Sequence, residues 1–144
     1  MKIVDWDEYK ELLVKLYEKI KLDEFNEIVA IGRGGSIIGA FLASKLGIPT
    51  FYPIFLRHVG TGRNRRVEDI KPQEEKIKNL TGNILVVDDF LRDGLAIKYV
   101  LNLISKKASI KTLVMYDRKG SEFKPDFVGE YIIDTEITFP YDVF

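Results

Sequence analysis

Two adjacent carboxylates at the end of an apolar run are the residues whose types and spacing point most directly to chemistry. Ile84–Val87 is continuously apolar, and Asp88 and Asp89 follow it at once. Such a run predicts a buried strand, so the acids are expected at its carboxyl end. Paired carboxylates can accept hydrogen bonds from a ribose diol and can help to hold Mg²⁺. The alternative interpretation is a solvated turn that caps a helix.

A glycine-containing turn follows the acids and leads toward a predicted helix, whose free N–H groups suit a phosphate. The turn consists of Arg92, Asp93, Gly94, Leu95 and Ala96. It contains no serine or threonine, and Asp93 adds a negative charge where a phosphate would lie. We expect Arg92 to offset that charge by bidentate contact with the phosphate. Alternatively, Asp93 caps the helix and points away from the ligand.

A second turn suited to anions follows an earlier apolar strand. The run Glu27–Gly32 breaks into Arg33, Gly34 and Gly35. Glycines let the backbone approach an anion closely, and a guanidinium offers a fork of donors to phosphate oxygens. Gly-Gly turns after strands are also common for structural reasons, so this signal depends on its context.

Composition limits the classes of function. The 144 residues are 46% apolar and 31% charged, which is typical of one globular domain, here residues 1–144. The 22 basic and 22 acidic residues balance, so no global field favours nucleic acid or an anionic membrane. Cysteine is absent, which excludes thiolate chemistry. No apolar run approaches the roughly 20 residues of a membrane span, and no signal peptide is evident, so we expect a cytoplasmic protein.

The elements that must position these residues alternate between strands and helices. Helices are predicted over 6–20, with Asp5 as N-cap, over 36–46 and over about 93–107; strands are predicted over 27–32, 50–56, 83–88, 110–116 and 128–133. This order predicts an α/β fold with a mostly parallel sheet flanked by helices. Residues 57–72 are predicted to be a long flexible loop. Its candidate ligand-binding residues are His58, Arg63, Arg65 and Arg66, and Arg57 and Lys71 are also basic.

Four segments resemble type I phosphoribosyltransferases, in the order that this family shows. The run 84–96 resembles the signature that binds phosphoribosyl diphosphate (PRPP), and Arg33-Gly34-Gly35 resembles the pyrophosphate loop. Lys124–Gly129 and the tail Ile137–Asp142 are similar to segments of small microbial purine enzymes of the family. The resemblance implies the type I phosphoribosyltransferase fold with a hood loop, here residues 57–72.

The resemblance also implies roles for particular residues. Asp88 and Asp89 would bind ribose and Mg²⁺, directly or through water, and residues 92–96 would bind the 5′-phosphate. Arg33, Gly34 and Gly35 would bind pyrophosphate. The base pocket would contain Arg118, Lys119, Glu136, Ile137 and Phe139. Glu136 stands where the family stacks an aromatic ring on the base, and Phe139 or Tyr141 could substitute for that ring. Arg118 or Lys119 would donate to a carbonyl of the base, or would be a solvated charge.

The expected function is transfer of phosphoribose from PRPP to a nucleobase, a 6-oxopurine in purine salvage, with release of pyrophosphate. The expected cofactor is Mg²⁺, and the resemblance implies a homodimer; neither membrane nor nucleic acid is expected as a partner. The altered phosphate turn and Glu136 favour an alternative, a non-catalytic sensor of PRPP or a nucleotide on the same fold. A response-regulator receiver is set aside, because too little sequence follows Asp89 for the rest of that site.

Overall fold

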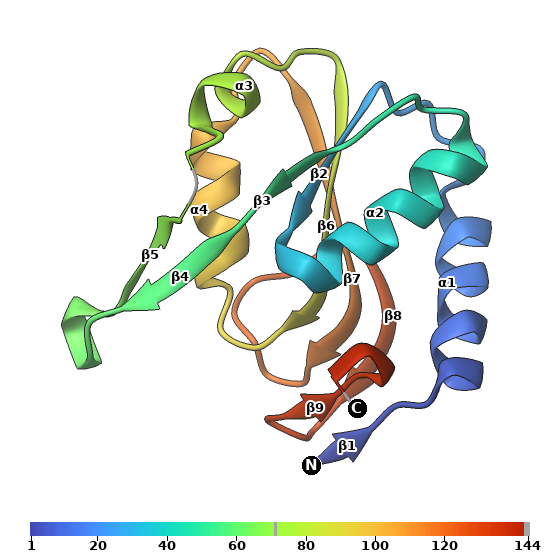
Figure 1. Cartoon of the computed structure of the whole chain (residues 1–144), viewed down its shortest axis with the longest axis vertical. Helices are drawn as coiled ribbons and strands as arrows, with labels where there is room; N and C mark the ends of the chain where they lie inside the picture. Colours follow the sequence, from blue (N-terminus) through green and yellow to red (C-terminus); the bar gives the residue numbers. More distant parts are fainter. Residues whose placement is uncertain (71, 143–144) are drawn as a thin grey trace.

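A parallel sheet forms the centre of the molecule. The computed structural model describes residues 1–70 and 72–142. Five strands lie in the order β3-β2-β6-β7-β8, and every neighbouring pair is parallel. They are β3 (Tyr52–Ile54), β2 (Glu27–Ile31), β6 (Asn83–Leu91), β7 (Ser109–Arg118) and β8 (Phe127–Ile132). The predicted α/β architecture is confirmed (Figure 1).

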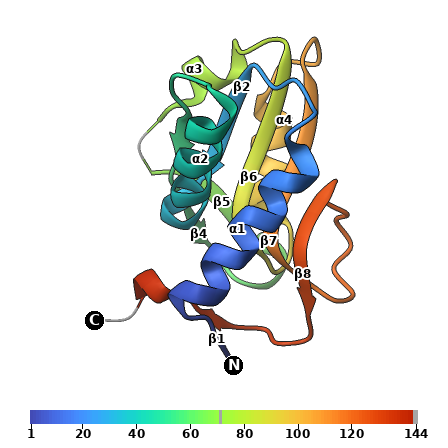
Figure 2. The same ribbon diagram turned by 90° about the vertical axis from the view of Figure 1, so that its right-hand side faces the viewer.

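Helices cover both faces of this sheet. Helices α1 (Trp6–Ile20) and α2 (Gly32–Leu46) lie on one face, and α3 (Glu74–Lys78) and α4 (Leu95–Leu103) lie on the other (Figure 2). In β2, Ile28 and Ala30 pack under α1 and α2, whereas Val29 and Ile31 pack under α3 and α4. Because successive strand residues face opposite sides, a strand covered on both sides is continuously apolar.

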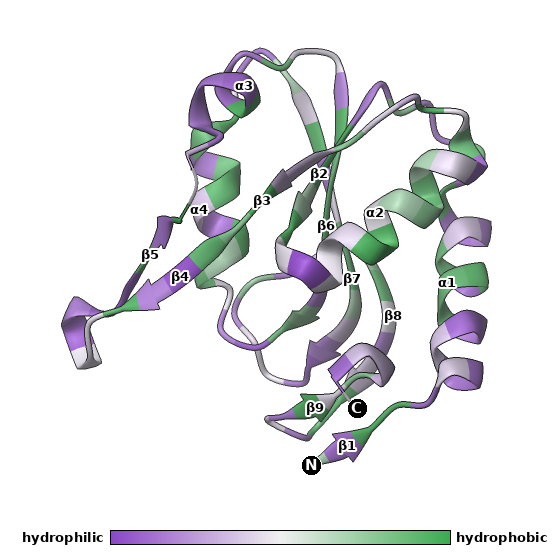
Figure 3. Cartoon of the chain, viewed as in Figure 1, coloured by the Kyte–Doolittle hydropathy of each residue, from purple (hydrophilic) through white to green (hydrophobic). Residues whose placement is uncertain are grey.

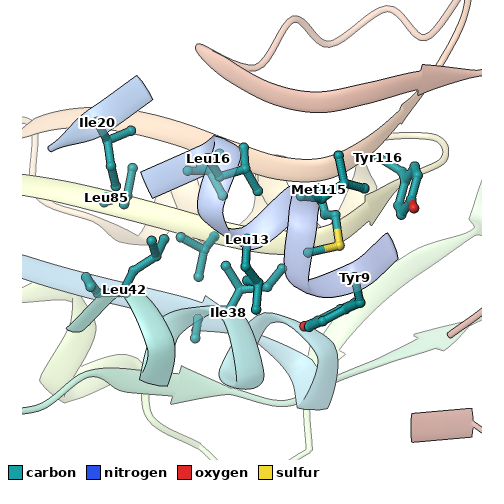
Figure 4. Packing of buried hydrophobic residues seen from close by; sticks show 14 of the residues in the cluster. Tyr9, Leu13, Leu16, Ile20, Ile38, Leu42, Leu85, Met115 and Tyr116 are labelled. Carbon is teal, nitrogen blue, oxygen red and sulfur yellow. The ribbon is translucent and has the colours of Figure 1, made fainter. Parts of the chain in front are cut away.

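Helix α1 shows how closely local sequence rules are followed. Its N-cap is Asp5, whose Oδ1 accepts a hydrogen bond from the Glu8 N–H at 2.8 Å, as predicted. Leu13 and Leu16 of this helix are buried in the same cluster as Ile38 and Leu42 of α2 (Figure 4). The hydrophobic face of α1 therefore fixes the helix against the sheet and against α2.

The predicted boundaries differ from the structure most at β6, α2 and α4. Strand β6 continues past the acids to Leu91, because β7 extends beside it as far as the Leu91–Asp117 pair. Helix α2 begins at Gly32, not at residue 36, so the Arg33-Gly34-Gly35 turn belongs to the first turn of the helix. Helix α4 covers only Leu95–Leu103, because Ser105 forms a turn with the Lys107 N–H.

The prediction of a loop without regular structure over residues 57–72 is wrong for most of that segment. Strands β4 (Leu56–Val59) and β5 (Arg66–Asp69) form an antiparallel ribbon, joined by the short 3-10 helix η1 (Gly62–Asn64). An ion pair of 2.6 Å between Arg57 and Glu68 crosses the ribbon. We call residues 56–69 the hood ribbon; it projects from the sheet, and its tip is hydrophilic (Figure 3). Residue 71 lies outside the described residues.

The two ends of the described chain meet beside the sheet. Strand β1 (Lys2–Ile3) pairs in parallel with β9 (Ile137–Thr138), and the 3-10 helix η2 (Pro140–Asp142) follows. The Phe139 N–H donates to Asp142 Oδ2 at 2.9 Å and closes this last turn. Within residues 1–70 and 72–142, no helix has the length and hydropathy needed to cross a membrane.

Candidate active site

A cavity of about 860 Å³ lies where β2 and β6 end and α2 and α4 begin. In open parallel sheets, ligands bind in this position, beyond the carboxyl ends of the strands. The structure brings many of the predicted residues into its wall: Arg33, Gly34, His58, Asp88, Asp89, Arg92, Asp93, Gly94, Ala96, Glu136, Ile137 and Phe139. Seven predicted residues do not line it: Gly35, Arg63, Arg65, Arg66, Leu95, Arg118 and Lys119.

The acid pair lies inside strand β6, close to the carboxyl end of its buried part. The Asp89 N–H donates to Asp88 Oδ1 at 2.8 Å. Asp88 keeps part of its surface open to the cavity but is otherwise enclosed by protein. Burial is the main reason why the pKa of Asp88 is raised well above its usual range, and the adjacent Asp89 carboxylate adds to the shift. Holding two neighbouring carboxylates in one enclosed wall therefore costs electrostatic free energy. A ligand with hydroxyl donors, or a cation, would reduce that cost.

The contact between Tyr141 and Asp89 is the feature of the cavity that sequence reasoning missed. Its hydroxyl donates to Asp89 Oδ2 at 2.5 Å, and the tyrosine lines the same cavity. Burial, followed by the Asp89 charge, raises the pKa of this tyrosine, so the hydroxyl stays protonated and remains a donor. The aromatic-Pro-aromatic-acid tail was the available signal, but it suggested stacking on the base and not a bond to the ribose acids.

The glycines of the Arg33-Gly34-Gly35 turn are required by close packing against β6. A Cβ on Gly34 would lie 1.8 Å from Asp89 Oδ2, and one on Gly35 would lie 2.8 Å from the Val87 carbonyl oxygen. Any side chain at Gly34 would therefore displace the acid. Arg33 projects from the same turn, is exposed and lines the cavity.

The start of α4 forms the opposite wall. Gly94 has a left-handed φ of 81°, which lets the chain turn from β6 into the helix. Asp93 Oδ1 accepts a hydrogen bond from the Leu95 N–H at 3.2 Å, and Asp93 Oδ2 lies 2.8 Å from Arg65 Nη1 of the hood ribbon. The guanidinium N–H groups do not point at Asp93 Oδ2, so the contact is an ion pair without a hydrogen bond. This oxygen accepts no hydrogen bond from any described residue. Asp93 thus binds the first N–H group of α4, whose N-cap residue is Gly94, and it also ties the hood ribbon to the turn.

Arg92 lies at the cavity, whereas Arg118, which was expected in the base pocket, does not line it. No ion pair between Arg92 and Asp93 forms in the described part of the chain; Arg65 is the partner of Asp93. The Arg92 side chain is exposed at the cavity, and its carbonyl oxygen accepts a hydrogen bond from Arg118 Nε at 3.1 Å. Arg118 therefore braces the phosphate turn from outside the cavity. Lys119 lines a separate shallow hollow beside Tyr131.

The side of the cavity next to the tail contains the other predicted base-pocket residues. Glu136 is exposed there and Ile137 is partly buried. Phe139 is buried, stacks one ring face on Tyr141 and also contacts Tyr9 and Tyr116, so little of its ring is open to a base. Phe139 is therefore placed as a packing residue at the edge of the cavity. Among residues 1–70 and 72–142, no three His, Asp or Glu side chains group into a metal-binding cluster.

Comparison with known proteins agrees with this architecture. The sheet order and the placement of the cavity are those of doubly wound α/β proteins, whose ligands bind beyond the carboxyl ends of the strands. The chain matches the family model for the phosphoribosyl transferase domain over residues 5–143, and it belongs to that family. The predicted family is confirmed.

Three similar proteins illustrate the match. The xanthine-guanine phosphoribosyltransferase of Idiomarina loihiensis is 25% identical over 143 residues, which cover 97% of this chain and 86% of the relative. The crystal structure of a purine phosphoribosyltransferase from Pyrococcus horikoshii has a TM-score of 0.81 at 21% identity, covering 99% of this chain and 94% of that one. A hypothetical protein from Neisseria gonorrhoeae with bound ppGpp has a TM-score of 0.80 at 21% identity, covering 99% and 90%.

Proposed function

We propose that the protein transfers the phosphoribosyl group of PRPP to a purine base, specifically a 6-oxopurine, and releases pyrophosphate. A ring nitrogen of the base forms a bond to C1 of the ribose while the bond from C1 to the pyrophosphate oxygen breaks. The electron pair of the broken bond leaves with pyrophosphate, and the ring N–H proton that the base gives up passes to solvent or to pyrophosphate. The observation that carries this proposal is one cavity that combines the acid pair of β6, the glycine turn of α2 and the start of α4. The sequence match to xanthine-guanine enzymes over almost the whole chain supports the choice of base.

Different residues of the cavity bind different parts of the ligand in this proposal. Asp88 and Asp89 accept hydrogen bonds from the ribose hydroxyls, and the start of α4 receives the 5′-phosphate. Arg33, together with the first turn of α2, receives the pyrophosphate. Such chemistry requires the positioning of two reactants and stabilisation of the positive charge that develops on the sugar. The adjacent carboxylates supply negative charge on that side of the cavity.

Magnesium fits this donor set as part of the ligand. The described residues offer two neighbouring carboxylates and no larger cluster, and Mg²⁺ is typically held by one or two carboxylates plus substrate phosphates and water. Asp88 and Asp89 would hold the ion, directly or through water. When bound, it would neutralise the diphosphate and make pyrophosphate a better leaving group.

The base end of the cavity differs from an aromatic pocket. Glu136 presents a carboxylate there, which can accept hydrogen bonds from ring N–H or amino groups of a base but cannot stack on it. Arg118 would reach a 6-oxo group only if its bond to the Arg92 carbonyl changed. We therefore assign Glu136 and Ile137 to the base end and keep the role of Arg118 as a prediction.

The direct test is an assay of pyrophosphate release with PRPP, Mg²⁺ and a panel of hypoxanthine, guanine, xanthine and adenine. We expect turnover with at least one 6-oxopurine, little with adenine, and none without Mg²⁺. The Asp88→Asn/Asp89→Asn double variant is the control for contaminating activity. Tight binding of PRPP without turnover of any base would overturn the catalytic proposal.

One observation favours a second function, a non-catalytic sensor. Asp93 already occupies a helix-start N–H and the Arg65 guanidinium, which are the kinds of donor that a phosphate uses. A protein that binds PRPP or a nucleotide weakly and reversibly, without turnover, would have such a site. The hypothetical protein from Neisseria gonorrhoeae, which has a similar fold, was crystallised with the nucleotide ppGpp bound. The homodimer and the cytoplasmic location stay predictions.

A further inference from the structure

The contact between Tyr141 and Asp89 joins the tail of the described chain to the ribose end of the cavity. The Tyr141 hydroxyl donates to Asp89 Oδ2 at 2.5 Å. Among the described residues, no N–H group or phenol donates to the other oxygen, Oδ1, and the Asp88 carboxyl lies within hydrogen-bonding reach of Asp89. One oxygen of the acid is therefore held by the protein, and the other stays available as an acceptor.

The tyrosine ring is held in place from three directions. It stacks in parallel on Phe139, with ring centroids 5.2 Å apart, and it meets Tyr9 edge-on at 5.8 Å. The turn that carries the ring is closed by the bond from the Phe139 N–H to Asp142. On the third side lies Gly34, where an added Cβ would lie 2.7 Å from the tyrosine hydroxyl. These contacts leave the hydroxyl little freedom to leave the acid.

A second hydroxyl lies close by and lacks a partner. Tyr9 is 1% exposed, and its hydroxyl has no hydrogen-bond partner among the described residues. Burial, followed by the charge of Asp89, raises its pKa, so this hydroxyl also stays protonated. The acid is thus bordered by two protonated phenols, of which only Tyr141 is bonded to it.

We propose that Tyr141 is a positioning residue of the ribose site, which fixes Asp89 Oδ2 so that Oδ1 is presented to the sugar. This inference rests on the proposed function, because it concerns the sugar that the acid pair would bind. The opposite arrangement is a tyrosine that competes with the ribose hydroxyls for Asp89. The tight ring packing argues against competition, since a competitor must be able to move away.

The test is the Tyr141→Phe variant, which keeps both ring contacts and removes only the hydroxyl. Tyr99→Phe is the matched control, because the Tyr99 hydroxyl also donates to a carboxylate, that of Glu74, but lies outside the cavity. Titrations with PRPP and ribose 5-phosphate in the presence of Mg²⁺, and with pyrophosphate in its absence, so that no ion links pyrophosphate to the acid pair, give the readout. Losing one hydrogen bond to a charged group is expected to weaken PRPP and ribose 5-phosphate binding about tenfold. Pyrophosphate, which has no ribose hydroxyls, should bind as before.

An Asp89→Asn background shows whether Tyr141 acts through the acid. There, Tyr141→Phe should add little to the loss that Asp89→Asn already causes, so the two effects should be clearly non-additive. Unchanged or tighter PRPP binding in Tyr141→Phe would overturn the proposal, as would an equal loss of pyrophosphate binding. If wild type binds PRPP, either result rejects this inference alone. If wild type binds neither PRPP nor ribose 5-phosphate, the proposed function fails and this inference fails with it.

Discussion

The two ends of the cavity are built in different ways. At the proposed ribose end, Asp89 is held by a neutral tyrosine hydroxyl and packs against a buried glycine. At the proposed phosphate end, Asp93 forms an ion pair of 2.8 Å with Arg65, which lies on the ribbon that projects from the sheet. The ribose end is therefore arranged before any ligand arrives. At the proposed phosphate end, the Asp93 carboxylate already contacts donors that a phosphate would need. A phosphate that binds there must therefore displace Asp93 from them.

The largest effect is expected at the prearranged end. The Asp88→Asn/Asp89→Asn double variant should abolish PRPP binding, which corresponds to a loss of at least about a hundredfold, because both acceptors of the ribose hydroxyls lose their charge. The fold should remain intact, since both substitutions keep the side-chain shape. Calorimetric titration measures the loss of PRPP affinity, and circular dichroism checks that the fold is intact. Unchanged affinity in the double variant would remove the acid pair from the site.

The next largest effect should come from Gly34→Ala. The added Cβ would lie 1.8 Å from Asp89 Oδ2, so the acid and Tyr141 must move apart. We expect at least about a tenfold loss of PRPP affinity, because a shift of the acid by this much breaks a charge-assisted bond. Gly39→Ala in the same helix is the control, because its nearest contact is a methyl group of Ala30 at 3.1 Å. Equal losses in both variants would attribute the effect to the helix and not to the acid.

Binding should become tighter at the other end when the internal carboxylate loses its charge. Asp93→Asn keeps an oxygen for the Leu95 N–H but removes the repulsion of a phosphate and frees Arg65. Unit charges about 4 Å apart interact by roughly 4 kcal/mol at an effective dielectric of 20. Partial exposure and salt reduce this, so we expect about a tenfold gain for ribose 5-phosphate.

Glu68→Gln provides the control for that gain. It breaks an ion pair in the same hood ribbon without touching the phosphate turn, so ribose 5-phosphate affinity should stay the same. Hydrogen exchange over residues 56–69 should become faster in Asp93→Asn, because the ribbon loses its tie to α4, and should slow again with ligand. Weaker binding in Asp93→Asn would mean that the carboxylate helps the ligand.

The smallest expected effect is on stability. Burial raises the pKa of Asp88 in the folded protein, so the folded state binds its proton more tightly than the unfolded state. Between the unfolded pKa and the raised folded pKa, stability therefore falls as pH rises, and the loss is complete above the folded value. Asp88→Asn should raise the unfolding temperature at neutral pH by roughly a few degrees and should flatten this dependence. Thermal unfolding from pH 4 to 8 measures both; an unchanged profile would show that Asp88 is well solvated.

Much of the fold was predictable because its signals are local. The apolar periodicity of residues 6–20, with Asp5 before it, predicts a capped helix. The apolar run 84–87 predicts a strand that is buried where other elements cover both of its sides. The hood was mispredicted as a loop because its strands pair only with each other, on a ribbon with few buried residues. Exposed ribbons lack the apolar alternation on which strand prediction depends.

The sequence by itself determined the α/β order, the family, the acid pair that follows the buried run of β6 and the glycine turn that follows β2. Only the tertiary structure decided which side chains meet there: Tyr141 with Asp89, Arg65 with Asp93, and Arg118 with the carbonyl of Arg92. Each contact joins segments far apart in the chain, whose side chains could equally have faced solvent. Local patterns report which residues lie on a strand or helix, whereas the packing of the whole sheet sets which of them share a cavity.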